Sequence, residues 1–91
     1  MKENRKIETA NFAVIFSYSF DSEVAVYLFE DEEGAKKFLK ESYEEEMRID
    51  TEENGWDSYG YINKDGTFAK IETPFHDHTD KTEMRIGNIY R

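Results

Sequence analysis

The sequence predicts an α+β domain, in which a mainly antiparallel sheet of about five strands carries one helix across one of its faces. Apolar residues alternate with a period of two on both sides of a single segment, residues 30–53, whose apolar residues recur at helical spacing. A strong hairpin signal, Asp65-Gly66, then joins two of the later strands. The predicted order is ββαβββ. The 91 residues are expected to form one domain over 1–91, with the polar residues 1–10 as a flexible or irregular lead-in.

The first two strands are predicted from aromatic and aliphatic alternation. Residues 12–20 alternate bulky apolar residues with smaller ones, which is typical of a strand with one buried face. Asp21-Ser22 is expected to form the turn that follows. Residues 24–29 are apolar on both faces, so we expect this second strand at or near the centre of the sheet.

The helix is predicted from an apolar stripe with three- and four-residue spacing, formed by Ala35, Phe38, Leu39, Tyr43 and Met47. Asp31 is the expected N-cap, and two glutamates follow it in the first turn, where the helix dipole favours negative charge. Pairs of opposite charge four residues apart are expected on the outer face: Glu32–Lys36, Glu33–Lys37, Lys40–Glu44 and Glu44–Arg48.

The second half of this segment is strongly acidic. Residues 30–53 hold eleven acidic and four basic residues, so they carry −7 of the net charge of −9. Four acidic residues lie near the C-terminal end of the helix, where the helix dipole favours cations: Glu44, Glu45, Glu46 and Asp50. At about 100° per residue, Glu46 projects near the middle of the apolar stripe. Either the last turn overhangs the sheet and leaves Glu46 in water or paired, or Glu46 is a partly buried carboxylate with a raised pKa on a surface for a basic partner.

The remaining chain predicts a turn and three strands. Asn54-Gly55 can form a positive-φ turn, and the following Trp56 either covers the edge of the core or is an exposed recognition anchor. Residues 58–63 and 67–73 form the predicted hairpin, which Pro74 ends. Residues 75–81 are expected to be a polar loop, and residues 82–90 a fifth strand with a bulge or bend near Gly87.

One sheet face is not covered by any predicted element. Five aromatic residues either form an exposed surface there, suited to dimerisation or partner docking, or line the core under the helix: Tyr18, Tyr27, Tyr59, Tyr61 and Phe68.

The only cluster that resembles a metal-ligand set is His76, His78 and Asp80. Two imidazoles and a carboxylate can hold zinc, nickel or iron, and in an extended segment His76 and His78 point to the same side. A further protein ligand is not evident, and histidines in polar loops are usually solvated. The same loop could respond mildly to pH, because histidine titrates near neutrality.

Several function classes lack the residues they require. The sequence has no Cys, no nucleophile elbow, no paired acid and base, and no phosphate-binding loop, so neither an enzyme nor a cofactor is predicted. The net charge of −9 argues against direct binding to nucleic acid or to an anionic membrane. No secretion signal or membrane-spanning stretch is recognised, which favours a cytoplasmic location.

Two stretches resemble a known group of proteins. The segments SYEEEMRIDTEENGW, residues 42–56, and TEMRIGNI, residues 82–89, resemble small uncharacterised proteins of gut Clostridia-type bacteria. This resemblance implies a compact bacterial domain without an assigned activity.

The function favoured by the sequence is a non-catalytic protein-binding or regulatory module that presents an acidic helix end to a basic protein surface. The residues expected to contact the partner are Glu41, Glu44, Glu45, Glu46, Glu52, Glu53 and Trp56. Three alternatives stay open: a metal- or ligand-binding protein built on the histidine loop, a nucleic-acid-mimic inhibitor from a mobile element, and a homodimer formed through the exposed sheet face.

Overall fold

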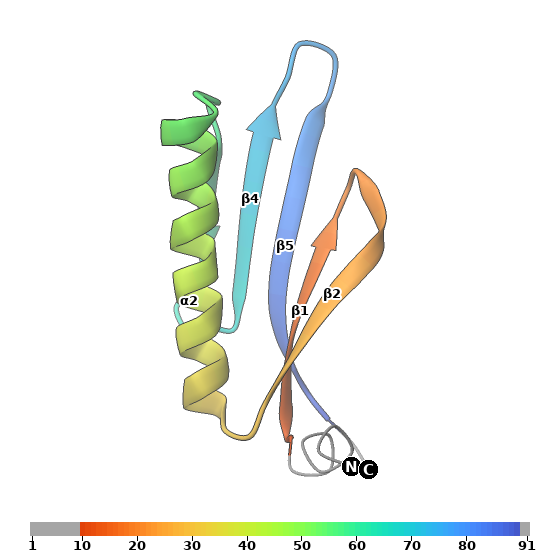
Figure 1. The fold of residues 1–91 in the computed structure, drawn as a ribbon, viewed down its shortest axis with the longest axis vertical. Helices are drawn as coiled ribbons and strands as arrows, with labels where there is room; N and C mark the ends of the chain where they lie inside the picture. The colour runs from red at the N-terminus through yellow and green to blue at the C-terminus, as the bar shows by residue number, and fades with distance from the viewer. Residues whose placement is uncertain (1–9, 90–91) are drawn as a thin grey trace.

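A computed structural model describes residues 10–89, which form one five-stranded sheet and one helix (Figure 1). The elements in chain order are β1 (Phe12–Tyr18), β2 (Asp21–Phe29), α2 (Glu32–Arg48), the π-helical turn η1 (Ile49–Glu53), β3 (Tyr59–Ile62), β4 (Phe68–Pro74) and β5 (Thr79–Asn88). The strands lie in the order β2-β1-β5-β4-β3, and every neighbouring pair is antiparallel. The predicted α+β class and ββαβββ order are confirmed. The predicted lead-in lies almost wholly outside the described residues.

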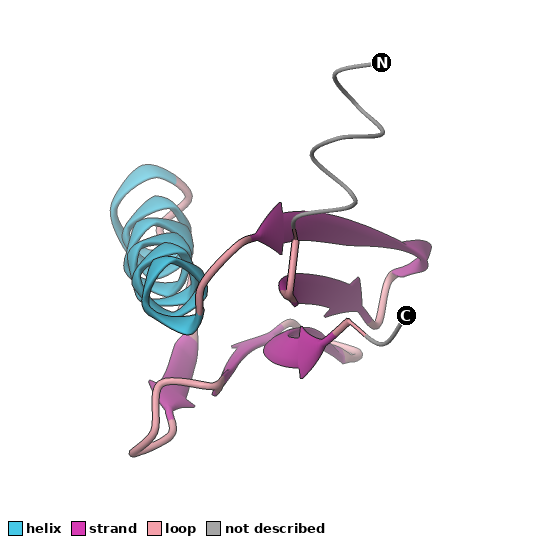
Figure 2. Ribbon diagram, turned by 90° about the horizontal axis from the view of Figure 1, so that it is seen from below, coloured by secondary structure: helices cyan, strands magenta, loops and turns pink. Residues whose placement is uncertain are grey.

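The core lies between α2 and one face of the sheet. Figure 2, viewed almost along the helix, shows α2 on one side of a strongly twisted sheet. Leu39 of α2 is fully buried against Val14 of β1 and Met84 of β5. Burial of one such side chain stabilises the fold by about 1.5–3 kcal/mol relative to its exposure to water.

The beginning of α2 follows the prediction. The Asp31 carboxylate accepts a hydrogen bond from the backbone N–H of Gly34 at 2.7 Å, which confirms it as the N-cap. Glu32 and Lys36 form the first predicted charge pair at 3.8 Å. The other three pairs are absent from the ion pairs of residues 10–89. In place of Glu44, Arg48 bonds Glu45, three residues earlier.

The prediction for β2 is wrong in its position and in its turn. β2 is an edge strand that pairs with β1 alone, because β5 takes the other side of β1. The connecting turn is Ser19-Phe20, since Asp21 already pairs with Tyr18 in the sheet. The Asp21 carboxylate accepts from the N–H of Glu23 at the start of β2. Apolar residues on both faces of a strand therefore do not identify a central strand here.

β5 begins earlier than predicted and is regular. It starts at Thr79, so the connection from β4 shrinks to a tight turn in which the N–H of Phe75 donates to the carbonyl of His78 at 2.7 Å. The pairing of β5 with β1 continues through Gly87 without a register shift, so of the predicted bulge or bend the bulge is wrong. The predicted β3–β4 hairpin is confirmed. In its turn, Gly66 has a φ of 75°. The side-chain oxygen of Asn63 accepts hydrogen bonds from the backbone N–H groups of Thr67 and Phe68.

The aromatic residues divide between the two faces of the sheet. Tyr18 and Tyr27 lie on the face that carries α2, as the interpretation of a single core expects. Tyr59, Tyr61 and Phe68 lie on the opposite face, where the Arg85 guanidinium lies 5.8 Å from the centre of the Phe68 ring. This second face is the open one among the elements of residues 10–89, and none of the helices there could cross a membrane.

Candidate functional site

The acidic end of α2 is anchored to the sheet through Asp50. The side chain of Asp50 accepts a hydrogen bond from the Ser58 hydroxyl at 2.8 Å and a longer one from the Thr73 hydroxyl at 3.3 Å. Ser58 and Thr73 are buried and their hydroxyl oxygens lie 2.6 Å apart, so the single Thr73 hydroxyl hydrogen is donated either to Ser58 or to Asp50. The helix continues into η1, and Gly55 with φ 69° lets the chain turn back, so that the N–H of Trp56 donates to the carbonyl of Asp50. Asp50 therefore has a structural role that offsets its unfavourable place in the helix dipole.

A hollow of about 310 Å³ opens between this end of α2 and the ends of β1, β4 and β5. We call it the end hollow. Its walls combine three carboxylates with three aromatic rings: Glu46, Asp50, Asp80, Tyr18, Phe20 and Trp56. Three acids without a basic residue in the wall, beside aromatic rings, suit an organic cation such as a lysine or arginine side chain, because both Coulomb attraction and cation–π contact favour it.

Glu46 is the carboxylate whose surroundings are least favourable to its charge. The Glu46 residue is exposed, as expected if the last helical turn overhangs the sheet, yet desolvation by nearby protein atoms, followed by the negative charges of Asp50 and Glu45, raises its pKa above the usual value. The pKa of the Tyr18 hydroxyl is also raised, first by burial and then by the charge of Glu46. No hydrogen bond or ion pair of residues 10–89 ends on the Glu46 side chain. Glu46 is thus an exposed negative charge, close to other acids and without a paired cation among residues 10–89.

A second hollow, of about 330 Å³, lies between α2 and the β2 side of the sheet. We call it the side hollow. Its residues are Phe16, Tyr27, Phe38, Glu41, Ser42, Glu45 and Glu46. The Phe38 ring lies 4.9 Å from Tyr27 and 6.1 Å from Phe16, so the floor is aromatic and the rim along α2 is acidic. Glu46 belongs to both hollows, which are therefore adjacent.

The structure separates the predicted partner-contacting residues into two groups. Glu41, Glu45, Glu46 and Trp56 line one hollow or both, whereas Glu44, Glu52 and Glu53 line neither. Glu45 and Glu53 are also partly neutralised, because Arg48 bonds both at 2.8–2.9 Å. This contact lowers the pKa of Glu45.

Trp56 lies outside the core cluster, and its role as a recognition anchor stays a prediction. Its ring packs edge-to-face on Phe75 at 5.2 Å, and 42% of the residue remains exposed beside the end hollow. The sequence did not identify Asp50, Tyr18 or Phe20 as site residues. The four-residue spacing of Glu46 and Asp50 was the available signal, since it places both on one side of the helix.

The histidine loop does not form the predicted metal site. His78 contacts Asp77 at 2.6 Å and Asp80 at 3.3 Å, but within residues 10–89 no group of three or more His, Cys, Asp or Glu side chains is placed to hold a metal ion. The His78 ring stacks on Phe75, with the ring centroids 5.1 Å apart. The bond to Asp77, and then the charges of Asp77 and Asp80, raise the pKa of His78.

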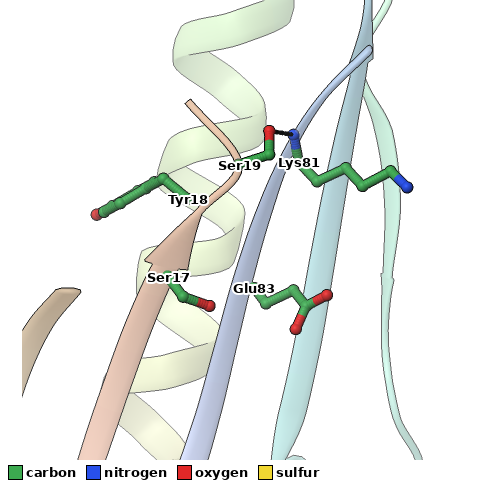
Figure 3. Close-up of a pocket in the computed structure, with 5 residues that line it drawn as sticks. All are labelled: Ser17, Tyr18, Ser19, Lys81 and Glu83. Carbon is green, nitrogen blue, oxygen red and sulfur yellow. Dashed lines mark hydrogen bonds between the residues drawn. The ribbon is translucent and has the colours of Figure 1, made fainter. Parts of the chain in front are cut away.

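A third hollow, on the open face of the sheet, is polar and about 210 Å³ in volume. Figure 3 shows its five residues, with Tyr18 directed away from the Lys81 and Glu83 side chains. The Ser19 hydroxyl oxygen accepts from the backbone N–H of Lys81 at 2.8 Å, and Glu83 is paired with Arg85 at 2.6 Å. Because these polar groups already have partners, this hollow has no evident ligand.

Comparison with known proteins gave no further assignment. No protein-family model, curated protein or solved structure matched the chain. The resemblance to small clostridial proteins stays a prediction, and the function has to be inferred from the two hollows at the acidic end of α2.

Proposed function

We propose that this protein is a non-catalytic protein-binding or regulatory module that holds a basic segment of a partner protein at the acidic end of α2. One observation carries the proposal: Glu46 is an exposed carboxylate without a paired cation, at the junction of two hollows that combine acidic and aromatic side chains. A cation from the partner would stabilise this charge, and the aromatic rings would contact the apolar part of a lysine or arginine side chain.

The charge distribution supports a basic partner over an acidic one. Residues 30–53 carry −7 of the net charge of −9, so a basic segment is attracted to this end of the molecule before contact. Arg48, two residues after Glu46, is occupied by Glu45 and Glu53. The proposal includes a cytoplasmic location, which is compatible with a sequence that contains no Cys.

The test compares two pairs of substitutions that change the net charge equally. Glu41→Gln with Glu46→Gln removes two charges from the hollows, whereas Glu44→Gln with Glu52→Gln removes two charges outside them. Binding of a capped tetra-arginine peptide is measured by titration calorimetry at several salt concentrations. We expect the first pair to weaken binding about five- to tenfold, because charges in direct contact with the peptide attract it more than distant, screened ones. The salt dependence should also fall, because two contacting charges are removed.

The matched pair decides the result. If Glu44→Gln with Glu52→Gln weakened binding as much as the first pair, the peptide would be responding to overall charge, and the site proposed here would be wrong. Unchanged affinity in both double variants would also show that the proposed site is wrong. A third arm with a capped tetra-glutamate peptide, which should not bind, controls for association through the peptide backbone.

A further inference from the structure

β2 has the sequence of a central strand in the position of an edge strand. Its residues are apolar on both faces, yet Val24, Val26 and Tyr27 are 56%, 51% and 44% exposed. Its nine residues include Asp21 and Glu23 as the only charged ones, both at the beginning. Along its outer side, β2 has no paired strand among residues 10–89.

Soluble proteins usually protect such an edge, because its free N–H and C=O groups pair readily with another chain. The opposite edge of this sheet is protected because its strand, β3, is short, with four residues. β2 has no Lys and no Pro, and its single irregularity lies at the end next to the β1–β2 turn, between Ser17 and Tyr18 of β1. The exposed part from Val24 to Phe29 is therefore ready to accept a further strand.

The free edge borders the side hollow. Tyr27 of β2 forms one wall of this hollow, and Glu41, Glu45 and Glu46 of α2 form the acidic rim opposite. A strand added to β2 would direct every second side chain toward this rim, at intervals of roughly 6.6–6.8 Å. Glu41 and Glu45, four residues apart on α2, are separated by roughly 6 Å along the helix. Basic residues at alternate positions of the added strand would thus be spaced to meet both.

The other side chains of the added strand would point to the open face of the sheet. There they would lie beside Val24 and Val26, which are 56% and 51% exposed and pair with Ser17 and Ile15 of β1. Apolar residues would continue this surface. The added strand is thereby specified on both of its faces: basic toward α2 and apolar on the opposite side.

We propose that β2 is the docking edge for an extended segment of the partner protein in which basic and apolar residues alternate, added to the sheet as a sixth strand. This inference rests on the proposed function, because it assigns a conformation to the basic segment held at the acidic end of α2. A second copy of the chain fits less well. Antiparallel pairing of two β2 strands about Val26 would place the acidic residues 21–23 of one copy beside residues 29–31 of the other, between two chains that each carry a net charge of −9.

The probe is a capped octapeptide of alternating lysine and valine, used with the full ¹⁵N-labelled chain. Two further peptides have the same sequence but carry N-methyl groups on the backbone nitrogen of either all lysines or all valines. In a strand these two sets of N–H groups point to opposite edges, so each methylated peptide keeps one edge able to donate hydrogen bonds. Both have the same charge and the same degree of methylation, which makes each the control for the other.

We expect the unmethylated peptide to bind and to slow hydrogen exchange of alternate β2 amides, while β3 amides are unchanged. One methylated peptide should bind about tenfold more weakly than the other, since it loses several backbone hydrogen bonds to β2. Equal binding of the two methylated peptides would overturn strand addition, and the proposed function would stand if the Glu41→Gln, Glu46→Gln variant still weakened them. Equal binding that is also insensitive to this variant would remove both proposals. If β2 amides became protected with increasing protein concentration in the absence of peptide, the occupant would be a second copy and this inference would be wrong.

Discussion

Replacement of Asp50 by alanine tests whether the acidic end of α2 is held to the sheet by one carboxylate. Asp50 accepts hydrogen bonds from Ser58 at 2.8 Å and from Thr73 at 3.3 Å. Hydrogen bonds to a charged acceptor stabilise a fold by about 1.5–3 kcal/mol each when their geometry is good, and the 3.3 Å bond is weak. In the variant, the Ser58 and Thr73 hydroxyls keep each other as partners at 2.6 Å. One strong hydrogen bond is therefore lost.

A smaller effect has the opposite sign. Removal of a negative charge from the helix C-terminus stabilises the helix by about 0.3–1 kcal/mol. The net loss for Asp50→Ala is then about 1–2 kcal/mol. For a domain of this size, that loss lowers the midpoint of thermal unfolding by roughly 5–15 °C.

The assay is urea unfolding of Asp50→Ala, Ser58→Ala and the double variant. Their double-mutant cycle should give a coupling energy of about 1 kcal/mol, because the two side chains bond directly. Asp57→Ala, which removes an exposed carboxylate from the same loop, is the matched control and should change stability by about 0.5 kcal/mol or less. If Asp50→Ala behaved like Asp57→Ala and the coupling were zero, the carboxylate would not anchor the helix.

Three further variants test other contacts. Glu46→Gln should raise stability at neutral pH. The pKa of Glu46 is raised in the folded protein by burial and nearby acids, so the wild-type side chain contributes stability below its unfolded pKa near 4.5 that is lost as pH rises through the folded pKa. Urea midpoints measured across this pH range should therefore converge in acid, and a variant less stable than wild type at neutral pH would count against the reasoning. Asp77→Asn should lower the pKa of His78, which the Asp77 carboxylate raises, and an imidazole NMR titration that shows the same pKa in both proteins would exclude this contact. Gly60→Ala should cost about 1–3 kcal/mol, because the added Cβ would collide with a backbone carbonyl of β4, whereas Gly87→Ala, whose nearest neighbour would be 4.0 Å away, should cost less in the same unfolding assay.

The elements could be predicted because each is specified by local chemistry. Asp31 is followed by helical spacing and accepts the hydrogen bond that an N-cap requires. Asp65-Gly66 supplies the positive φ of the β3–β4 turn. These signals depend on neighbouring residues alone, so they do not require knowledge of which strands pair.

Strand order is not a local property, and here the prediction failed. β1 has two free sides, and its pairing with β5 rather than with another strand is decided some sixty residues later in the chain by the register that places Met84 beside Phe16. The two-sided apolar pattern of β2 was therefore assigned to the wrong position. Asp80 was not recognised as a residue of the end hollow for a similar reason. Residues 75–81 were expected to be a loop, whereas β5 already starts at Thr79.

The acidic end of α2 violates the dipole rule at several positions, and most of these violations have an explanation within the fold. Asp50 accepts hydrogen bonds from buried hydroxyls, while Glu45 and Glu53 share Arg48. Glu46 has no such compensation. Sequences that fold well tend to satisfy local rules at most positions, and exceptions without internal compensation concentrate where function requires them.

The second uncompensated feature is the unprotected apolar edge of β2, and the two features meet at one place. Tyr27 from the edge strand and Glu46 from the helix line the same hollow. Two independent defects would need two explanations, whereas one extended basic segment would pair with the edge and neutralise the carboxylate together. Folding stability accounts for neither feature, because a lysine in β2 and a glutamine at position 46 would each relieve the defect without disturbing the core. Their coincidence is the physical reason to seek a single partner for both.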